Sequence, residues 1–186
     1  MAPKIKITKE NIINAAFDLT RKNGATTINA RTLATYLNCS TQPIFSNFAT
    51  MDDLRIAVLQ RADELYSQYL AREIAEQKFP PYKATGIAYI RFAKDEKELF
   101  KLLFMRDRTD ENTIVTSQSD SLVKKVLHES TGLNGSEALL FHLKMWMCVH
   151  GIATMVATGY FELDWDTISN LISDVYKGAK LQYETE

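Results

Sequence analysis

Apolar residues recur along most of this chain at spacings of three and four, without the alternating β-branched runs that are typical of strands. This periodicity is that of amphipathic helices, so the sequence predicts an all-α fold. Two short helices are expected near the N-terminus, and a long helix is expected from Thr50 to about Gln77, where Phe79-Pro80-Pro81 ends it. Later helices are expected over residues 82–94, 95–104, 110–130, 136–159 and 164–181.

Side chains that accept hydrogen bonds from backbone N–H groups mark most of the expected helix starts. The candidate caps are Asn29, Ser40, Thr50 with Asp53, Asp95 with Glu98, Ser136 and Asp164. The helix expected over residues 110–130 has three candidate starts, which are Asp110, Asn112 and Thr113.

The two short helices are joined by a turn of only a few residues. In the first helix, Leu33, Ala34 and Leu37 lie on one face. Asn38 tolerates the left-handed conformation and ends this helix, and Ser40 is expected to cap the second. The pattern predicts a helix-turn-helix, with a small solvated helix of an ordinary globular protein as the alternative.

The second short helix, expected over about residues 41–48, has an inward and an outward face. Ile44 and Phe48, four residues apart, point inward. The outward side chains are hydrogen-bonding groups together with one aromatic ring: Thr41, Gln42, Phe45, Ser46 and Asn47. Such a face suits insertion into the major groove of DNA.

About the first 55 residues resemble the N-terminal domain of tetracycline-repressor-type (TetR family) regulators. The resemblance rests on a combination of segments: Ile12 to Leu19, Gly24, Thr26-Thr27, Leu33-Ala34, Ser40 to Phe48, and Leu54. Phe45, Asn47 and Met51 depart from the family pattern, which usually has a hydroxyl-bearing aromatic, a His and a Lys at these places. In that family the hydroxyl and the Lys commonly contact phosphates, so neither role is carried over to Phe45 or Met51.

The resemblance implies an N-terminal three-helix DNA-binding domain, taken as residues 1–50, and a C-terminal helical domain for ligand binding and dimerisation, taken as residues 51–186. The residues expected to contact an operator in double-stranded DNA are Lys9, Arg31, Ser40, Thr41, Gln42, Phe45, Ser46 and Asn47. Arg31 is expected to reach a guanine edge or a phosphate, with a surface salt bridge as the alternative. Lys9 lies next to an N-terminal arm that fits DNA contact and a solvated basic tail equally well.

Charge is divided between the two expected domains. The chain has a formal net charge of −1, but residues 1–50 carry six basic and two acidic side chains and so hold +4, which leaves −5 for the other 136 residues. A positive field that attracts phosphate is therefore confined to the N-terminal part.

The helix expected over residues 136–159 is apolar on nearly all sides, and such a helix must be covered on all sides. One domain covers one face, and we expect a second copy of the chain to cover another in a four-helix bundle with the last helix. The expected dimer contacts are Gly151, Ala153, Thr154, Ala157, Ile168, Leu171, Ile172 and Val175. Trp146 and His150-Gly151 also resemble the Trp…His-Gly motif of one C-terminal class in the TetR family, which implies the same homodimer.

Aromatic and methionine side chains of the C-terminal helices are candidates for an apolar ligand pocket. They are Tyr66, Tyr89, Phe92, Phe104, Met105, Met145 and Trp146, with His150 as a polar member. The same set is also explained as ordinary core, and a buried His such as His150 or His142 often bonds a backbone carbonyl. The resemblance implies a small-molecule effector of unknown identity.

Enzyme chemistry is not expected from this sequence. Cys148 and His150 project about 200° apart on one helix and cannot meet within a chain. His142 and His150 are roughly 12 Å apart along the same helix, which is too far to share a metal. The sequence holds no glycine-rich phosphate loop, so no catalytic residue, metal or cofactor is assigned.

Composition favours a cytoplasmic protein without a membrane partner. Cys39 and Cys148 fall in different expected domains, which fits a reducing compartment. The sequence shows neither a signal-peptide pattern nor an apolar stretch of membrane-spanning length without polar residues. Together these features predict a dimeric bacterial transcriptional regulator, a repressor that a small molecule releases from a palindromic operator. The alternatives are a helical interaction module and a constitutive DNA binder without a ligand.

Overall fold

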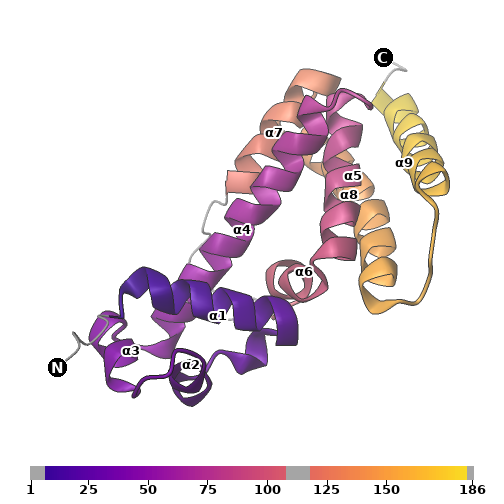
Figure 1. Ribbon diagram of the computed structural model, residues 1–186. Helices are drawn as coiled ribbons and strands as arrows, with labels where there is room; N and C mark the ends of the chain where they lie inside the picture. The colour runs from indigo at the N-terminus through magenta and orange to yellow at the C-terminus, as the bar shows by residue number, and fades with distance from the viewer. Residues whose placement is uncertain (1–6, 108–117, 184–186) are drawn as a thin grey trace. The chain divides into compact units, whose positions relative to one another are not determined.

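The computed structural model describes residues 7–107 and 118–183, and the regular structure within them is entirely helical (Figure 1). The α-helices are α1 (Lys9–Asn23), α2 (Ala30–Tyr36), α3 (Gln42–Asn47), α4 (Met51–Ala75), α5 (Pro81–Asp95), α6 (Lys97–Phe104), α7 (Gln118–Thr131), α8 (Gly135–Thr158) and α9 (Trp165–Lys180). Two short 3₁₀ helices, η1 (Ala25–Thr27) and η2 (Leu181–Tyr183), follow α1 and α9. The predicted all-α fold is confirmed.

Contacts divide the chain into two compact units. The N-terminal unit comprises Met1–Ala62 and Glu98–Arg108, and the C-terminal unit comprises Asp63–Lys97 and Thr109–Glu186. The chain passes from the first to the second within α4 and returns for α6. The boundary expected after residue 50 separates a DNA-binding from a ligand-binding domain. The division into compact units does not test that functional boundary, which stays a prediction.

The N-terminal unit is built around one apolar core to which α1, α2, α3 and α4 contribute (Figure 1). Its fully buried members include Ile12, Leu33, Ile44 and Leu54. Because α3 has only six residues and could not persist alone in water, the burial of Ile44 and of Phe48 just after it holds this helix in place.

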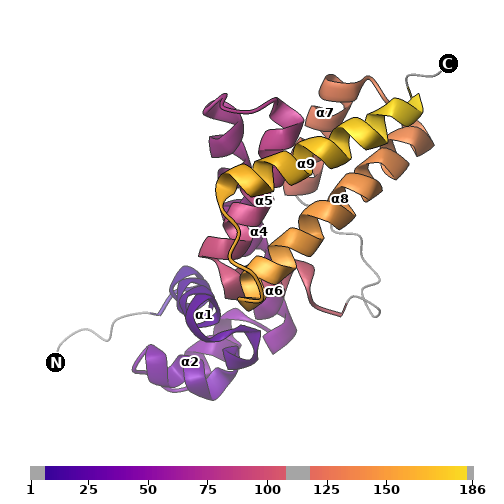
Figure 2. The ribbon, with the colours of Figure 1, turned by 90° about the vertical axis from the view of Figure 1, so that its right-hand side faces the viewer.

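The C-terminal unit has α5 at its centre, with α7, α8 and α9 packed against it. Ile87, Ile90 and Phe92 of α5 are buried, and Phe141 of α8 and Ile172 of α9 are buried as well. Helices α8 and α9 lie side by side (Figure 2).

Three of the predicted helix caps are confirmed. The Asn29 side chain accepts a 2.9 Å hydrogen bond from Thr32 N, and the Asp164 side chain accepts one of 2.8 Å from Thr167 N. Thr50 and Asp53 form the expected box, since Asp53 Oδ2 accepts from Thr50 N at 2.8 Å and Thr50 Oγ1 accepts from Asp53 N at 3.1 Å. These side chains satisfy N–H groups that the first helical turn leaves unpaired.

Three other predicted starts were wrong by one or two residues. Thr41 rather than Ser40 precedes α3, and its side chain makes no capping hydrogen bond. Asn134 rather than Ser136 precedes α8. The cap pair expected at Asp95 and Glu98 does not form, since Asp95 still belongs to α5 and α6 starts at Lys97.

The helix predicted over residues 110–130 is present as α7 from Gln118. Its three candidate starts, Asp110, Asn112 and Thr113, lie outside the described residues.

Candidate functional site

The turn between α2 and α3 fixes which side of α3 faces solvent. Asn38 has a φ of 49°, a left-handed conformation that Asn adopts more easily than most residues. Cys39 N then bonds Ala34 O at 2.9 Å, which closes the end of α2. With Ile44 and Phe48 buried, the opposite face of α3 is turned away from the core.

The predicted DNA-contacting residues of this segment lie on that outward face or just before it. Gln42, Phe45 and Ser46 are exposed on α3, and 53% of the Phe45 surface is open to solvent. Ser40 is exposed ahead of the helix, and Thr41 and Asn47 are half-buried.

Two of the polar side chains on this face are bonded to their own helix. Ser46 Oγ donates to Gln42 O at 2.9 Å, and Asn47 Nδ2 donates to Pro43 O at 2.7 Å. The Gln42 amide is exposed and makes no side-chain hydrogen bond within residues 7–107 and 118–183. Gln42 is therefore the side chain of α3 with its donor and acceptor both available.

Arg31 differs from two other arginines of the N-terminal unit. Arg55 is paired with Asp52 at 2.5 Å, and Arg61 is paired with Glu10. Arg31 is exposed in the first turn of α2 and makes no ion pair in the part of the chain that the structure describes. The salt-bridge alternative for Arg31 thus has no support among the described side chains.

Lys9 lies beside the end of α3. Its Nζ atom is 5.1 Å from the centre of the Phe48 ring, a distance at which a cation is attracted to the face of an aromatic ring. The structure therefore brings Lys9, predicted from the basic N-terminal segment, to the same small helix as Gln42 and Phe45.

In the C-terminal unit, an aromatic cluster connects α4, α5 and α8. The Tyr66 ring packs edge-on against Tyr89, with ring centres 5.8 Å apart, and at a tilt against Phe92, with ring centres 5.2 Å apart. The Tyr89 hydroxyl lies 2.8 Å from His150 Nδ1, and the Trp146 ring stacks on His150 at 4.8 Å. Burial lowers the pKa of His150, which favours the neutral imidazole in this hydrogen bond.

The eight ligand-pocket candidates do not all belong to one unit. Phe104 and Met105 are in the N-terminal unit, whereas the other six are in the C-terminal unit. Tyr66, Tyr89, Phe92 and Met145 are buried, but Trp146 is exposed on the outer side of α8. The burial of these four side chains is also what ordinary core residues would show, so the ligand pocket stays a prediction.

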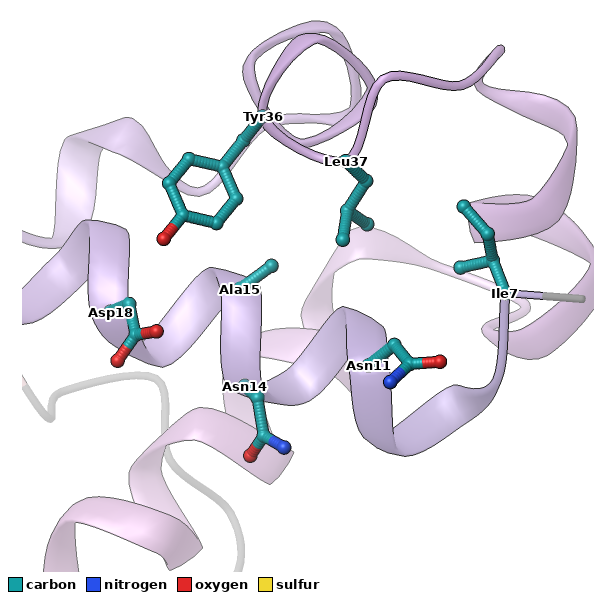
Figure 3. Close-up of a pocket in the computed structure, with 7 residues that line it drawn as sticks. All are labelled: Ile7, Asn11, Asn14, Ala15, Asp18, Tyr36 and Leu37. Atoms are coloured by element: carbon teal, nitrogen blue, oxygen red, sulfur yellow. The ribbon is translucent and has the colours of Figure 1, made fainter. Parts of the chain in front are cut away.

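A groove of about 340 Å³ lies instead in the N-terminal unit, between α1 and the end of α2 (Figure 3). It is lined by Ile7, Asn11, Asn14, Ala15, Asp18, Tyr36 and Leu37. None of the eight pocket candidates contributes to it. The sequence analysis missed this groove because its lining comes from two helices and carries no local motif.

The predicted dimer contacts divide into buried and accessible residues. Ala153, Ala157, Ile168 and Ile172 are buried within a single chain, so they cannot offer surface to a second copy, and this part of the prediction needs correction. The sequence pattern could not show which face of α8 turns inward. Gly151, Thr154 and Val175 are half-buried, and Leu171 is exposed.

The apolar surface that does remain accessible follows one side of α8. It consists of Leu139, Leu140, Leu143, Trp146 and Met147, and it is called the α8 stripe below. These residues recur at spacings of three and four and so share a face. Met147 is 61% exposed, and α8 has no Asp, Glu, Lys or Arg after Lys144.

By length and composition, α8 also resembles a membrane-crossing helix. An 18-residue window of it has a mean hydropathy of 1.4, and 28% of that window is buried inside the chain. An apolar helix that is so little covered leaves a surface that a partner could cover.

The cysteine and histidine side chains of α8 show no activated nucleophile. Burial raises the pKa of the Cys148 thiol, which keeps it protonated. His142 Nδ1 lies 2.9 Å from the Tyr82 hydroxyl, a second pair of the same kind as Tyr89 and His150. Each imidazole thus has a tyrosine hydroxyl at its Nδ1 atom, a partner that the sequence analysis did not anticipate.

Comparison with known proteins agrees with this geometry. A family profile described as tetracyclin repressor-like, C-terminal domain, matches residues 82–173. The chain is also similar to an uncharacterized HTH-type transcriptional regulator, YobS, of Bacillus subtilis (strain 168), with 20% identity over 172 residues that cover 92% of this chain and 90% of the relative. The matched profile is not described as the Trp…His-Gly class, so that finer resemblance stays a prediction.

Proposed function

Because the chain belongs to the tetracycline-repressor-like family of DNA-binding transcriptional regulators, we propose that it is a homodimeric repressor that a small molecule releases from a palindromic operator. The observation that carries this proposal is that one chain has both an outward polar face on α3 and an exposed apolar stripe on α8. The first face suits DNA, and the second requires another protein surface.

A second copy of the chain is the partner that best fits the α8 stripe. In a twofold dimer the same patch meets itself, so a stripe of leucine, methionine and tryptophan finds an apolar surface of equal length. Leu171 is a further exposed apolar residue, on α9, the helix that packs against α8. Two DNA-binding heads related by such an axis match a palindrome whose half-sites lie about one helical turn apart.

On the DNA side, the proposed contacts are those of the outward face and its basic neighbours. Gln42 and Phe45 face the bases, and Arg31 and Lys9 supply positive charge for phosphates or a guanine edge. The net charge of +4 in residues 1–50 adds a field of the sign that attracts DNA.

Ligand release is proposed through a binding site in the C-terminal unit. In this proposal the aromatic cluster of Tyr66, Tyr89 and Phe92 opens to line an apolar site, and the Tyr89–His150 pair supplies hydrogen-bonding groups. Helix α4 belongs to both units, so a change in its position would alter the separation of the two heads. A ligand needs only to bind the released state better than the DNA-bound state.

Two measurements test the DNA-binding dimer. Sedimentation at micromolar concentration should give a dimer, and selection from a random pool of DNA duplexes should enrich one palindromic sequence. A monomer that enriches no sequence would overturn the proposal. A dimer that enriches no sequence would favour the helical interaction module, and recovery of the protein on liposomes would make lipid, rather than a second copy, the partner of the α8 stripe.

Ligand release has its own test, performed on a Trp165→Phe variant so that Trp146 is the remaining tryptophan. A panel of apolar metabolites and drugs should include compounds that raise the melting temperature, change Trp146 emission and weaken operator binding together. Sequence-specific DNA binding with no such compound would favour a constitutive DNA binder. A reporter gene placed behind the selected operator distinguishes repression from activation.

A further inference from the structure

We propose that each operator half-site carries a thymine whose 5-methyl group packs against Phe45, next to an A·T pair that Gln42 recognises. The inference rests on the DNA-binding function proposed above and adds the base chemistry of the operator. Its basis is the distribution of used and unused groups on α3.

Phe45 presents the largest apolar surface on the outward face of α3, with 53% of it exposed. A phenyl ring has no group that bonds a phosphate, so this side chain gains nothing from the DNA backbone. In the major groove the thymine 5-methyl is the apolar feature that distinguishes one base pair from the others. Burying that methyl group against the ring is the contact that Phe45 is chemically suited to make.

The neighbouring polar side chains have less to offer to bases than their residue types suggest. Ser46 Oγ donates its hydrogen to Gln42 O, and Asn47 Nδ2 donates to Pro43 O. Using the Ser46 donor on a base would cost its intrahelical hydrogen bond. Sequence recognition by α3 is therefore concentrated on Gln42 and Phe45.

Gln42 and Phe45 are three positions apart, so their side chains lie on the same side of the helix. A glutamine amide bonds adenine best, because it donates to N7 and accepts from the N6 amino group at once. The methyl contact of Phe45 and the amide contact of Gln42 thus fall on neighbouring base pairs. Both contacts select A·T pairs, which makes the core of the half-site A·T-rich.

The test uses the full-length protein and the palindromic duplex that it selects from a random pool. Each thymine is replaced in turn by uracil, which pairs identically and lacks only the methyl group. One thymine per half-site should be sensitive, with affinity falling about fourfold for one half-site and about fifteenfold for both. The other thymines should tolerate uracil.

Two variants assign the effect to the ring. Phe45→Ala should bind the thymine and uracil duplexes with equal affinity, whereas Phe45→Leu should keep part of the preference because leucine still offers apolar surface. Ile56→Ala, at an exposed apolar position of α4 outside the proposed DNA contacts, serves as the control and should keep both the affinity and the uracil sensitivity. Melting temperatures close to wild type are expected for all three, since both positions are exposed.

The outcomes separate this inference from the function on which it rests. If the wild type selects a palindrome but tolerates uracil at every thymine, the thymine contact is wrong and the DNA-binding function stands. A uracil effect that persists in Phe45→Ala would assign the methyl group to another side chain and also overturn the inference. If no sequence is enriched, the proposed function itself fails.

Discussion

The outward faces of α3 and α8 both leave large apolar side chains in water, but they do so in different company. On α3 a single ring, Phe45, stands among hydrogen-bonding side chains. On α8 the five apolar side chains of the α8 stripe share one face, and the charged residues of the helix are Glu137 and Lys144.

This difference in spacing distinguishes two kinds of partner. The edge of a DNA base pair offers hydrogen-bonding groups and at most one methyl group, so an isolated ring beside an amide matches it. A continuous stripe has no such match on DNA and gains most from another apolar surface of similar shape. The polarity of the neighbouring side chains, rather than exposure alone, therefore indicates which kind of partner each face binds.

The largest effect is expected from placing a charge in the α8 stripe. Met147→Glu should convert the dimer to a monomer and reduce operator affinity by about a hundredfold or more, because one head alone makes half the phosphate contacts. Sedimentation and a DNA titration measure the two results. Ile56→Glu, at an exposed apolar position of α4, is the matched control for sedimentation and should leave the dimer intact.

This variant replaces an experiment that the sequence alone would have suggested. A charge at Ala153 or Ala157 would enter the core of the subunit itself, since both are buried in one chain. Loss of the dimer in such a variant would not distinguish an interface from a misfolded subunit. A Met147→Glu protein that remains dimeric would remove the α8 stripe from the proposed interface.

The next effect concerns the polar member of the α3 face. Gln42→Ala should lose roughly 1–3 kcal/mol of discrimination between the selected operator and duplexes altered at one base pair per half-site. Its melting temperature should stay near that of the wild type, because Gln42 is exposed. Unchanged discrimination at every position would show that the Gln42 amide does not contact bases.

A smaller and different change is expected at Arg31. If it contacts only phosphate, Arg31→Ala weakens binding to specific and scrambled duplexes by the same factor, and the slope of log affinity against log salt falls by about one. If it reaches a guanine, the loss is confined to duplexes that carry that base. Lys22→Ala, an exposed cation elsewhere in the unit, provides the comparison.

The smallest effect is a pH dependence that arises from the interior side of α8. Burial lowers the pKa of His142 and of His150 from their ordinary value of 6.5. Since the unfolded chain then binds protons that the folded chain does not, stability is fully present above about pH 6.5 and declines as the pH falls below it. Urea unfolding between pH 7.5 and about 5 should show this decline, and a His142→Gln, His150→Gln double variant should flatten it.

The caps and the apolar spacings were readable in the sequence because they are local. Asn29, Thr50 with Asp53, and Asp164 bond backbone groups within three residues, so their roles follow from short segments. Ile44 and Phe48 were assigned to the core correctly for the same reason.

What the sequence could not supply depends on contacts between distant segments. The sequence of a helix that is apolar on nearly all sides, such as α8, does not show which face the rest of the chain covers. Ala153 was therefore predicted at the dimer interface, although it is buried within one chain. The side-chain bonds of Ser46 and Asn47 to their own helix were also missed, because a hydroxyl or amide on an outward face has several possible partners.

The two tyrosine–histidine pairs have a mechanical consequence for the C-terminal unit. Tyr82 meets His142 and Tyr89 meets His150, so α5 and α8 run in the same direction. The pairs are spaced by seven residues on α5 and eight on α8, about 10.5 Å and 12 Å of axial rise. A single hydrogen bond would still let one helix rotate about it relative to the other. Two hydrogen bonds at different heights oppose both rotation and sliding of α5 against α8. A slide of one helical turn, about 5.4 Å, would break both. Helices α5 and α8 are therefore expected to move together, so that a displacement of one also displaces the other.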